Sequence, residues 1–331
     1  MSKKVHQEND KGYKELLSHK KTFVELLRSF VKEKWVNDVD EENLELINKS
    51  YITPEYLEKE ADIIYKVRLK EKDVIFYCLL ELQSKVDYLM PLRLLEYMKC
   101  IWNDIIKNTD NNEMRRKGFR LPAVVPLVLY NGKNNWTAAR NFKEILNGYE
   151  NFESHVLDFN YILFDVNRYS EEDLLKAAKM VSTVFLLDQK IKPDELIERL
   201  RNSLNVISET TADQFIVFKR WLKYIFTARM PDESKTAIED IIEKADVKEV
   251  DSMISNLAST IEEMQKEAEE KGIEKGMEKG RVEGKVEGIA EGVLLVAKEA
   301  LKNGADIDFV AKITKLDVEV VSKIAKELHD S

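Results

Sequence analysis

Two strand-like runs lie so close together in the chain that they constrain its fold more than any other feature. The first is DIIYKVRLK at residues 62–70, the second is DVIFYCLLELQ at residues 73–83, and only Glu71 and Lys72 separate them. Both are rich in the β-branched and aromatic residues that favour strands. Since such a short link joins antiparallel neighbours, the sequence predicts a β-hairpin. Residues 74–80 are apolar on both faces, so the second strand should be central in its sheet.

Further elements on both sides of the hairpin complete an α/β pattern. Apolar residues at helical spacing predict one long helix from Asp10 to Trp35 and another after Asp87. Buried strands are expected within residues 121–133 and 161–166. The order helix, hairpin, helix, strand predicts an α/β fold with a mixed sheet. No glycine-rich dinucleotide motif or P-loop is present in the sequence, and the remaining residues are expected to be mostly helical.

The character of the chain changes after Pro231, where acidic residues dominate and glycine then recurs at every fourth position. Six of the chain's eleven glycines belong to this repeat: Gly272, Gly276, Gly280, Gly284, Gly288 and Gly292. We expect four parts: a catalytic-type domain at residues 1–190, a helical extension at 191–260, a glycine-tetrad helix or linker at 261–292, and a small tail at 293–331. The tail should be helical and resemble a helix-turn-helix unit.

The glycine repeat has two interpretations. Each glycine inside a helix costs about 1 kcal/mol relative to alanine, so six cost on the order of 6 kcal/mol and require compensation. Small residues at four-residue spacing permit close approach of a second helix, which favours self-association into a homo-oligomer. The alternative is a flexible, charged linker. The terminal helices could contact DNA or another protein.

Charge is distributed unevenly along the chain. The whole sequence carries −9, of which residues 231–331 carry −10, so the first 230 residues carry +1. Within that first part, residues 112–140 contain six basic side chains against Glu113 alone: Arg115, Arg116, Lys117, Arg120, Lys133 and Arg140. This stretch is a candidate DNA-binding patch, in particular Arg115 to Arg120, and an ordinary basic loop is the alternative.

Composition limits the class of protein. A 44% hydrophobic chain of 331 residues can bury a full core. No apolar run has the roughly 20 residues needed to cross a bilayer, so we expect a cytoplasmic protein with no membrane partner. Cys78 and Cys100 lie in apolar stretches and should be reduced core residues. Since the four histidines are scattered, any metal should be bound by oxygen atoms.

The hairpin register places acidic side chains opposite each other. If the hairpin is centred on Glu71 and Lys72, the numbers of paired residues sum to 143, and Asp62 then faces Glu81. Gln83 lies two residues further on the same face. Two opposed carboxylates at the end of an apolar strand repel each other unless a cation lies between them or one carboxyl is protonated. Mg²⁺ fits this arrangement, and the backbone carbonyl of Leu82 is a further potential ligand.

A metal held in this way would favour phosphodiester hydrolysis, because it activates water and stabilises charge on a phosphate. Gln83 could orient the attacking water. The alternative is that these acids are ordinary exposed residues at strand ends, and a one-residue slip of the register would put them on different faces.

Asp62, followed by ELQ at residues 81–83 on the next strand and then by a helix, resembles the PD-(D/E)XK nuclease pattern. More specifically, four segments resemble the Rpn family of recombination-promoting nucleases, whose members are also labelled transposases: DKGYKELLSHKKTFVELLRSFV, ADIIYKV, LLELQSKVDYLMPLRLLEYM and RLPAVVPLVLYNGKNNWTA. The match covers about residues 9–140, and the glycine repeat is similar to the family's C-terminal region.

This resemblance implies a restriction-endonuclease-like core and a Mg²⁺-dependent DNA endonuclease that acts in recombination or on mobile elements. It implies Asp62 and Glu81 as metal ligands and Gln83 in the position of the motif's lysine. Glutamine can form hydrogen bonds but carries no charge. Arg93 and Tyr97 match the family's arginine and tyrosine, and either could contact phosphate or pack at the helix edge. The second class of function is a nuclease-like module that binds DNA or partners without cutting.

Overall fold

The computed structural model describes residues 11–47, 63–69, 74–152, 154–189 and 191–329. The chain divides into two compact units, Met1–Ile261 and Glu262–Ser331, and each is described by itself.

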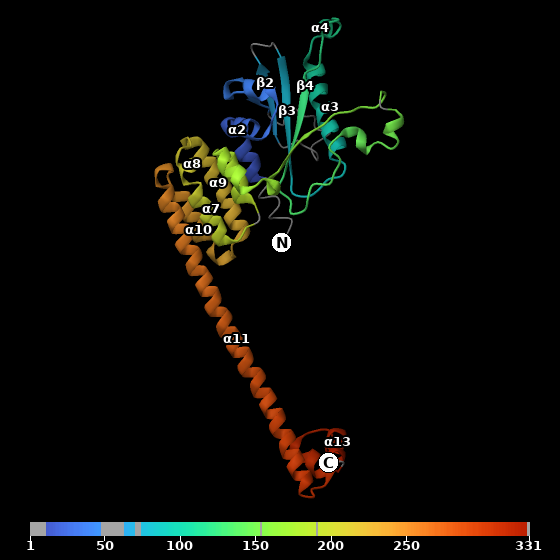
Figure 1. The fold of residues 1–331 in the computed structure, drawn as a ribbon, viewed down its shortest axis with the longest axis vertical. Helices are drawn as coiled ribbons and strands as arrows, with labels where there is room; N and C mark the ends of the chain where they lie inside the picture. The colour runs from blue at the N-terminus through green and yellow to red at the C-terminus, as the bar shows by residue number, and fades with distance from the viewer. Residues whose placement is uncertain (1–10, 48–62, 70–73, 153, 190, 330–331) are drawn as a thin grey trace. The chain divides into compact units, whose positions relative to one another are not determined.

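A five-stranded mixed sheet forms the centre of the first unit (Figure 1). Its strands, in sheet order, are β1 (Leu44–Leu46), β2 (Ile63–Leu69), β3 (Val74–Gln83), β4 (Ala123–Tyr130) and β5 (Ile162–Asp165). Strand β2 is antiparallel to its neighbours β1 and β3, whereas β4 and β5 run parallel to β3. The expected α/β fold with a mixed sheet is confirmed. The three-residue strand β1 was not predicted.

The hairpin has the register that its sequence predicts. Leu69 faces Val74 at one end of the pairing and Ile63 faces Leu80 at the other, so paired numbers sum to 143 throughout. The connection at residues 70–73 lies outside the described residues. With this register, alternate residues of β3 face opposite sides of the sheet.

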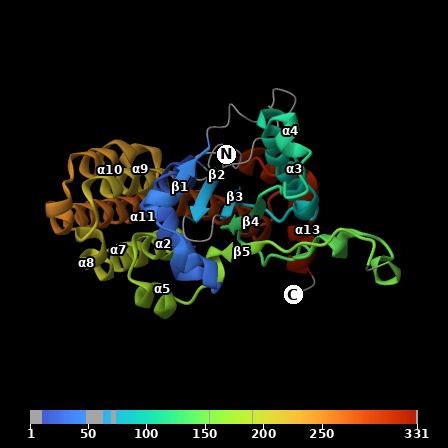
Figure 2. The ribbon, with the colours of Figure 1, turned by 90° about the horizontal axis from the view of Figure 1, so that it is seen from above.

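Helices pack on both faces of the sheet (Figure 2). On one face lies α3 (Met90–Asn108), whose Leu94 and Ile101 form a buried cluster with Tyr77 and Val128. On the other face lies α2 (Lys20–Phe30), whose Phe23 packs against Tyr65 of β2 with 4.4 Å between ring centroids and the rings tilted by 33°. The face of the sheet covered by α3 is the one that carries the predicted site.

The predicted single helix from Asp10 to Trp35 is wrong. Asp10 lies outside the described residues, residues 11–17 are helical, the chain turns at Ser18, and α2 ends at Phe30. The hydroxyl of Tyr65 donates hydrogen bonds to the carbonyl oxygens of Ser18 (2.6 Å) and Leu17 (3.2 Å). These carbonyls would accept from amides one turn later in a continuous helix, so the buried tyrosine stabilises the break.

The part of the first unit that follows β5 is mostly helical, as expected. A short helix, α4 (Asn111–Met114), follows α3. Beyond the sheet lie α5 (Glu171–Ala177), α6 (Met180–Asp188), α7 (Pro193–Asn202), α8 (Leu204–Ser208), α9 (Ala212–Arg229) and α10 (Asp232–Lys244). Trp221, Phe218 and Phe226 of α9 are fully buried, so this helix forms part of the core.

The second unit is built on α11 (Val250–Lys302), which begins in the first unit and is helical through all six glycines of the repeat. Its end packs with α12 (Ile307–Thr314) and α13 (Val318–His329) around Ala297, Val310 and Val321. Among the helices of the described residues, none combines the length and apolar character needed to cross a membrane.

Candidate functional site

Glu81 is a buried acid near the end of the central strand. Alternation along β3 places it on the same face as Tyr77, beneath α3, and Val128 of β4 is its neighbour in the parallel pairing. Only 4% of Glu81 is exposed. Because a buried carboxylate is costly without hydrogen bonds or an opposite charge, its partners define the site.

Two side chains meet one oxygen of Glu81. Gln83 donates a hydrogen bond from Nε2 to Glu81 Oε1 (3.3 Å), and Arg93 Nη1 lies 3.5 Å from the same oxygen. Arg93 also lies 3.4 Å from Asp87 Oδ2. The three residues taken from the sequence, Glu81, Gln83 and Arg93, therefore come together.

The start of α3 determines where Arg93 lies. The carboxylate of Asp87 accepts a hydrogen bond from the Leu89 amide (2.9 Å), and α3 begins at Met90 with Pro91 in its first turn. Arg93 follows within that turn, which brings its guanidinium over Glu81. The first turn of a helix also carries a partial positive charge that favours a nearby anion.

The two other predicted ligands are Asp62 and the backbone carbonyl of Leu82. Asp62 lies outside the described residues, so its position opposite Glu81 stays a prediction. The β2–β3 register is described up to Ile63 and Leu80, one step before that pair. Leu82 is described, and its side chain is buried on the face opposite Glu81. Its role as a carbonyl ligand also stays a prediction.

Tyr97 lies one turn after Arg93 but in a different environment. It is 3% exposed and belongs to the apolar cluster between α3 and the sheet. Arg93 keeps 35% of its side chain exposed. Of the two alternatives for this pair, packing describes Tyr97, whereas Arg93 remains accessible to a phosphate.

The structure does not bring the basic residues from Arg115 to Arg120 to the site. They follow α4, beyond the end of α3 and before the start of β4, where Ala123 pairs with Phe76. Glu81 and Gln83 lie at the other end of β3. A strand rises about 3.3 Å per residue, so the eight residues of β4 separate these ends by roughly 25 Å.

The sequence analysis did not single out Tyr130 and Asp165, which lie at the carboxyl ends of two parallel strands. Gln83, Tyr130 and Asp165 are the last residues of β3, β4 and β5 and are paired in sequence across the sheet. We call this the carboxyl edge. The general rule that ligands bind at the carboxyl ends of parallel strands could have singled out the Asp at the end of YILFD.

Asp165 is an acid held in a largely buried position, with 13% of its side chain exposed. Burial raises the pKa of its carboxyl above the ordinary 3.8, and the nearby Arg168 opposes that rise. Arg168 Nε lies 3.9 Å from Asp165 Oδ2. Asp165 therefore adds a carboxyl to the carboxyl edge, two strands away from Gln83.

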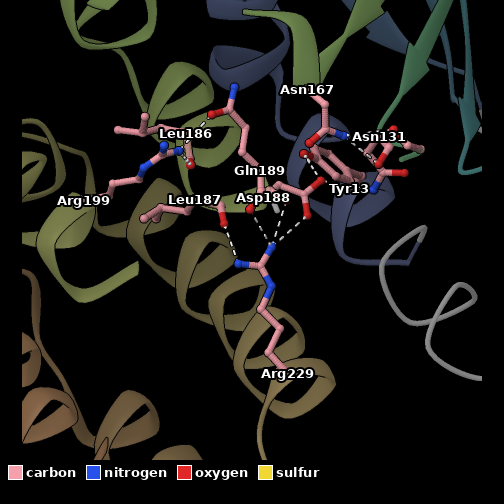
Figure 3. A network of polar contacts seen from close by, with 10 residues as sticks. Tyr13, Asn131, Asn167, Leu186, Leu187, Asp188, Gln189, Arg199 and Arg229 are labelled. Atoms are coloured by element: carbon pink, nitrogen blue, oxygen red, sulfur yellow. Dashed lines mark hydrogen bonds and ion pairs between the residues drawn. The ribbon is translucent and has the colours of Figure 1, made fainter. Parts of the chain in front are cut away.

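A buried polar network holds the carboxyl edge against the helices (Figure 3). The carboxylate of Asp188 accepts hydrogen bonds from the Tyr13 hydroxyl (2.8 Å) and from Asn131 Nδ2 (3.1 Å). Arg229 donates to the backbone carbonyls of Leu187 (3.0 Å) and Asp188 (2.8 Å). Burial, followed by the Asp188 charge, raises the pKa of Tyr13 well above 10.0, while burial lowers the pKa of Arg229.

The loops after β4 and β5 are joined directly. Asn167 donates from Nδ2 to the carbonyls of Asn131 (2.9 Å) and Gly132 (3.1 Å). Gly132 has to be glycine, because a Cβ at this position would overlap the hydroxyl of Tyr130. The network therefore fixes both loops beside the site.

Within the described ranges, no group of three or more His, Cys, Asp and Glu residues converges into a metal-binding cluster. The acids near Arg93 are Glu81 and Asp87. Their oxygen donors are of the kind that Mg²⁺ prefers.

Comparison with known proteins relates the chain to a family named for DNA mobility. The model of the family described as "Putative transposase, YhgA-like" matches residues 7–215. The chain is 25% identical over 127 residues to the "Recombination-promoting nuclease RpnD" of Escherichia coli O157:H7, a match covering 38% of this chain and 46% of that relative. Comparison with solved structures gave no match.

The matched region contains the hairpin, α3, the parallel strands β4 and β5, and helices α5 to α8. Glu81, Gln83, Arg93 and Asp165 all lie within it. Since the family model covers well over half of the chain, the chain belongs to the YhgA-like transposase family, as the resemblance to the Rpn nucleases implied.

Proposed function

We propose that this protein is a metal-dependent DNA endonuclease of the recombination-promoting type, with a restriction-endonuclease-like core. The observation that supports this most strongly is the buried Glu81 on the central strand, whose carboxylate is contacted by Gln83, two residues further on the same face, and by Arg93. The order of a helix, three antiparallel strands, α3 and a parallel strand supports the proposed core.

The donors at the site suit a hard divalent cation such as Mg²⁺. Glu81, Asp62 and the carbonyl of Leu82 would hold the ion through oxygen atoms. When bound, the metal would lower the pKa of water and stabilise negative charge on the phosphate being cut. Asp62 completes this set only if the β2–β3 register continues for one residue beyond Ile63.

The side chains around Glu81 have separate roles in this proposal. Gln83 orients the attacking water through its amide, since it can donate and accept but cannot remove a proton. Arg93 supplies the positive charge that Gln83 lacks, because a guanidinium stays protonated and can bind a phosphate through two hydrogen bonds. Asp87 positions Arg93 through the 3.4 Å ion pair.

Incubation with supercoiled plasmid tests this function. The wild-type protein and the double variant Asp62→Ala, Glu81→Ala are compared in Mg²⁺ and in EDTA. We expect nicked or linear DNA only from the wild type in Mg²⁺. Cleavage that survives the substitutions or the chelator would contradict the site. DNA binding without cleavage in every reaction would instead support the alternative of a nuclease-like binding module. We also propose a cytoplasmic location, because it fits a DNA-acting family.

We further propose that the protein is a homo-oligomer assembled through α11. Each of the six glycines in the repeat has open space where a Cβ would lie, so they cost the helix about 6 kcal/mol. Ion pairs such as Lys279–Glu283 offset only about 0.5 kcal/mol each. Contact with a second copy could compensate for the rest.

An exposed apolar stripe on α11 suits such a contact. Val282, Val286, Ile289, Val293 and Val296 follow one another at intervals of four and three residues, the spacing of a coiled-coil seam. Val286 is 63% exposed. At about 100° per residue, Gly284 and Gly288 lie on the opposite side of the helix from Val286.

The two faces predict different outcomes for oligomerisation. We expect Val286→Lys with Ile289→Lys to shift the protein to a smaller species in analytical ultracentrifugation, because two charges would be buried in the seam. The matched variant Gly284→Ala with Gly288→Ala should keep the assembly and stabilise the helix by about 2 kcal/mol. Dissociation by the alanine pair alone would identify the glycine face as the interface. A monomeric wild type would refute self-association.

A further inference from the structure

Strand β4 divides the basic stretch at residues 112–140 into two groups. Arg115, Arg116, Lys117 and Arg120 precede β4, whereas Lys133 and Arg140 follow it. Lys133 follows the end of β4 by three residues and so lies at the carboxyl edge, the end of the sheet that carries Glu81 and Gln83. Arg140 lies further along the loop, where its backbone carbonyl accepts a hydrogen bond from the Tyr161 amide just before β5. Its charge, like that of Arg168, opposes the rise that burial causes in the pKa of Asp165, which connects it to this edge. Although the two groups are close in sequence, the eight residues of β4 separate its two ends by roughly 25 Å.

A third cation joins this second group from the loop after β5. Arg168 donates from Nη2 to the backbone carbonyl of Lys133 (3.4 Å), which places the two residues side by side. The guanidinium of Arg140 lies 5.5 Å from the centre of the Tyr161 ring. All three basic side chains are exposed. Lys133, Arg140 and Arg168 are called the edge cations below.

The edge cations rest on a rigid base. Asn167, next to Arg168, donates to the carbonyls of Asn131 and Gly132, immediately before Lys133. Gln189 of the helical region donates to the carbonyl of Tyr169 (2.9 Å), on the other side of Arg168. Both loops are fixed through their backbones, and the side chains of the edge cations are exposed beside them.

The edge cations also lie close to the proposed reaction centre. Gln83 and Asp165 are paired with Tyr130 on either side, so two strand spacings of about 4.8 Å put them roughly 10 Å apart. DNA carries a phosphate every 3.4 Å of axis along each strand, so this distance corresponds to about three nucleotides. The Tyr88 hydroxyl lies 3.3 Å from Thr137 Oγ1, which connects the loop after β3 to the loop that bears Lys133 and Arg140.

We propose that the carboxyl edge is the DNA-docking surface, with Lys133, Arg140 and Arg168 contacting backbone phosphates next to the phosphate cut at Glu81. This inference rests on the proposed nuclease function and identifies the surface that positions its substrate. The acids at this edge already have cationic partners, because Asp165 pairs with Arg168 (3.9 Å) and Asp87 pairs with Arg93 (3.4 Å). Arginine and lysine are the side chains that bind DNA phosphates most often.

Two triple variants of equal charge change test the proposal. The edge variant is Lys133→Ala, Arg140→Ala, Arg168→Ala, and its control is Arg115→Ala, Arg116→Ala, Lys117→Ala at the opposite end of the sheet. Binding to a fluorescent DNA duplex is measured in EDTA over a range of salt concentrations. Each phosphate contact contributes about 0.9 to the slope of log affinity against log salt. We expect the edge variant to lose up to about 2.7 of that slope and on the order of 10- to 100-fold in affinity, with little change in the control.

A second variant distinguishes the loss of DNA contacts from misfolding. Lys133→Glu with Arg140→Glu leaves the Arg168 contact intact and should weaken binding further, while thermal unfolding reports whether the fold is kept. Wild-type affinity in the edge variants, or an equal loss in the control, would overturn the docking surface. The nuclease proposal would survive that result if the wild type still cleaved DNA and the Glu81→Gln variant did not. A wild-type protein that does not bind DNA would overturn the docking surface and leave cleavage to be judged by the plasmid assay.

Discussion

Replacing Glu81 with glutamine is expected to lower the rate of DNA cleavage at least about 100-fold without unfolding the protein. Glutamine keeps the size and most hydrogen bonds of the side chain but removes the negative charge that would hold the metal. Even residues outside the first coordination shell typically cost 10- to 100-fold in metal affinity or activity when changed, so a direct ligand should cost more. The Mg²⁺ concentration for half-maximal cleavage should rise as well, and this shift separates metal binding from DNA binding.

Glu45→Gln is a matched control for this substitution. Glu45 is a carboxylate of β1 whose Oε2 lies 3.8 Å from Lys66 Nζ, and its side chain is 66% exposed. Its β-strand partner is Lys66, which is paired with Tyr77, four residues before Glu81. Cleavage by this control should stay close to the wild-type rate. If Glu81→Gln cleaves as fast as Glu45→Gln does, Glu81 is not a metal ligand.

Replacing Asp188 with alanine is expected to lower the free energy of unfolding by about 3 to 5 kcal/mol. The substitution leaves the largely buried Arg229, whose side chain is 23% exposed, without the carboxylate that lies 3.7 Å away, and it removes an acceptor from Tyr13 and Asn131. Breaking a buried charge pair by removing one partner typically costs this much, because the remaining charge stays buried. Urea unfolding measures the loss.

Two further variants identify the cause of the loss. Asp188→Ala combined with Arg229→Met should destabilise the protein by less than the sum of the single changes, because the second removes the charge that the first leaves unpaired. Asp240→Ala breaks the exposed ion pair with Lys244 (3.4 Å) and should change stability by less than about 1 kcal/mol. A loss below 1 kcal/mol for Asp188→Ala would show that the network contributes little to stability.

Local patterns were sufficient to predict the hairpin and its register. The link between the two strands is too short for any arrangement other than an antiparallel pair, and a period of two residues decides which side chains share a face. For that reason Glu81 and Gln83 could be assigned to the same face from their numbers alone. The position of Asp62 remains the untested part of that argument.

Long-range contacts explain where the local patterns failed. The helix predicted from Asp10 to Trp35 is interrupted by the hydroxyl of Tyr65, which is 47 residues from Ser18 in the chain. Strand β1 has three residues, too few to show a period. Neither the helix break at Ser18 nor strand β1 is indicated by a pattern in its own stretch of sequence.

The positions of residues at the candidate site also depend on long-range contacts. Packing of α3 on the sheet decided that Arg93, twelve residues after Glu81, approaches its carboxylate while Tyr97 is buried. Because β3, β4 and β5 run parallel, Asp165 and Arg168 lie at the same end of the sheet as Gln83. Basic residues that look like one group in the sequence were separated to opposite ends of β4.

By itself, the sequence determined the hairpin, its register and the shared face of Glu81 and Gln83, because strand periodicity and a two-residue link act over a few residues. Only the tertiary structure decided which cations accompany that face and how the loops around it are fixed. The reason is physical: Arg93, Arg168 and Asp188 take their positions from helix packing and strand order, and these depend on contacts between segments that the linear sequence keeps far apart.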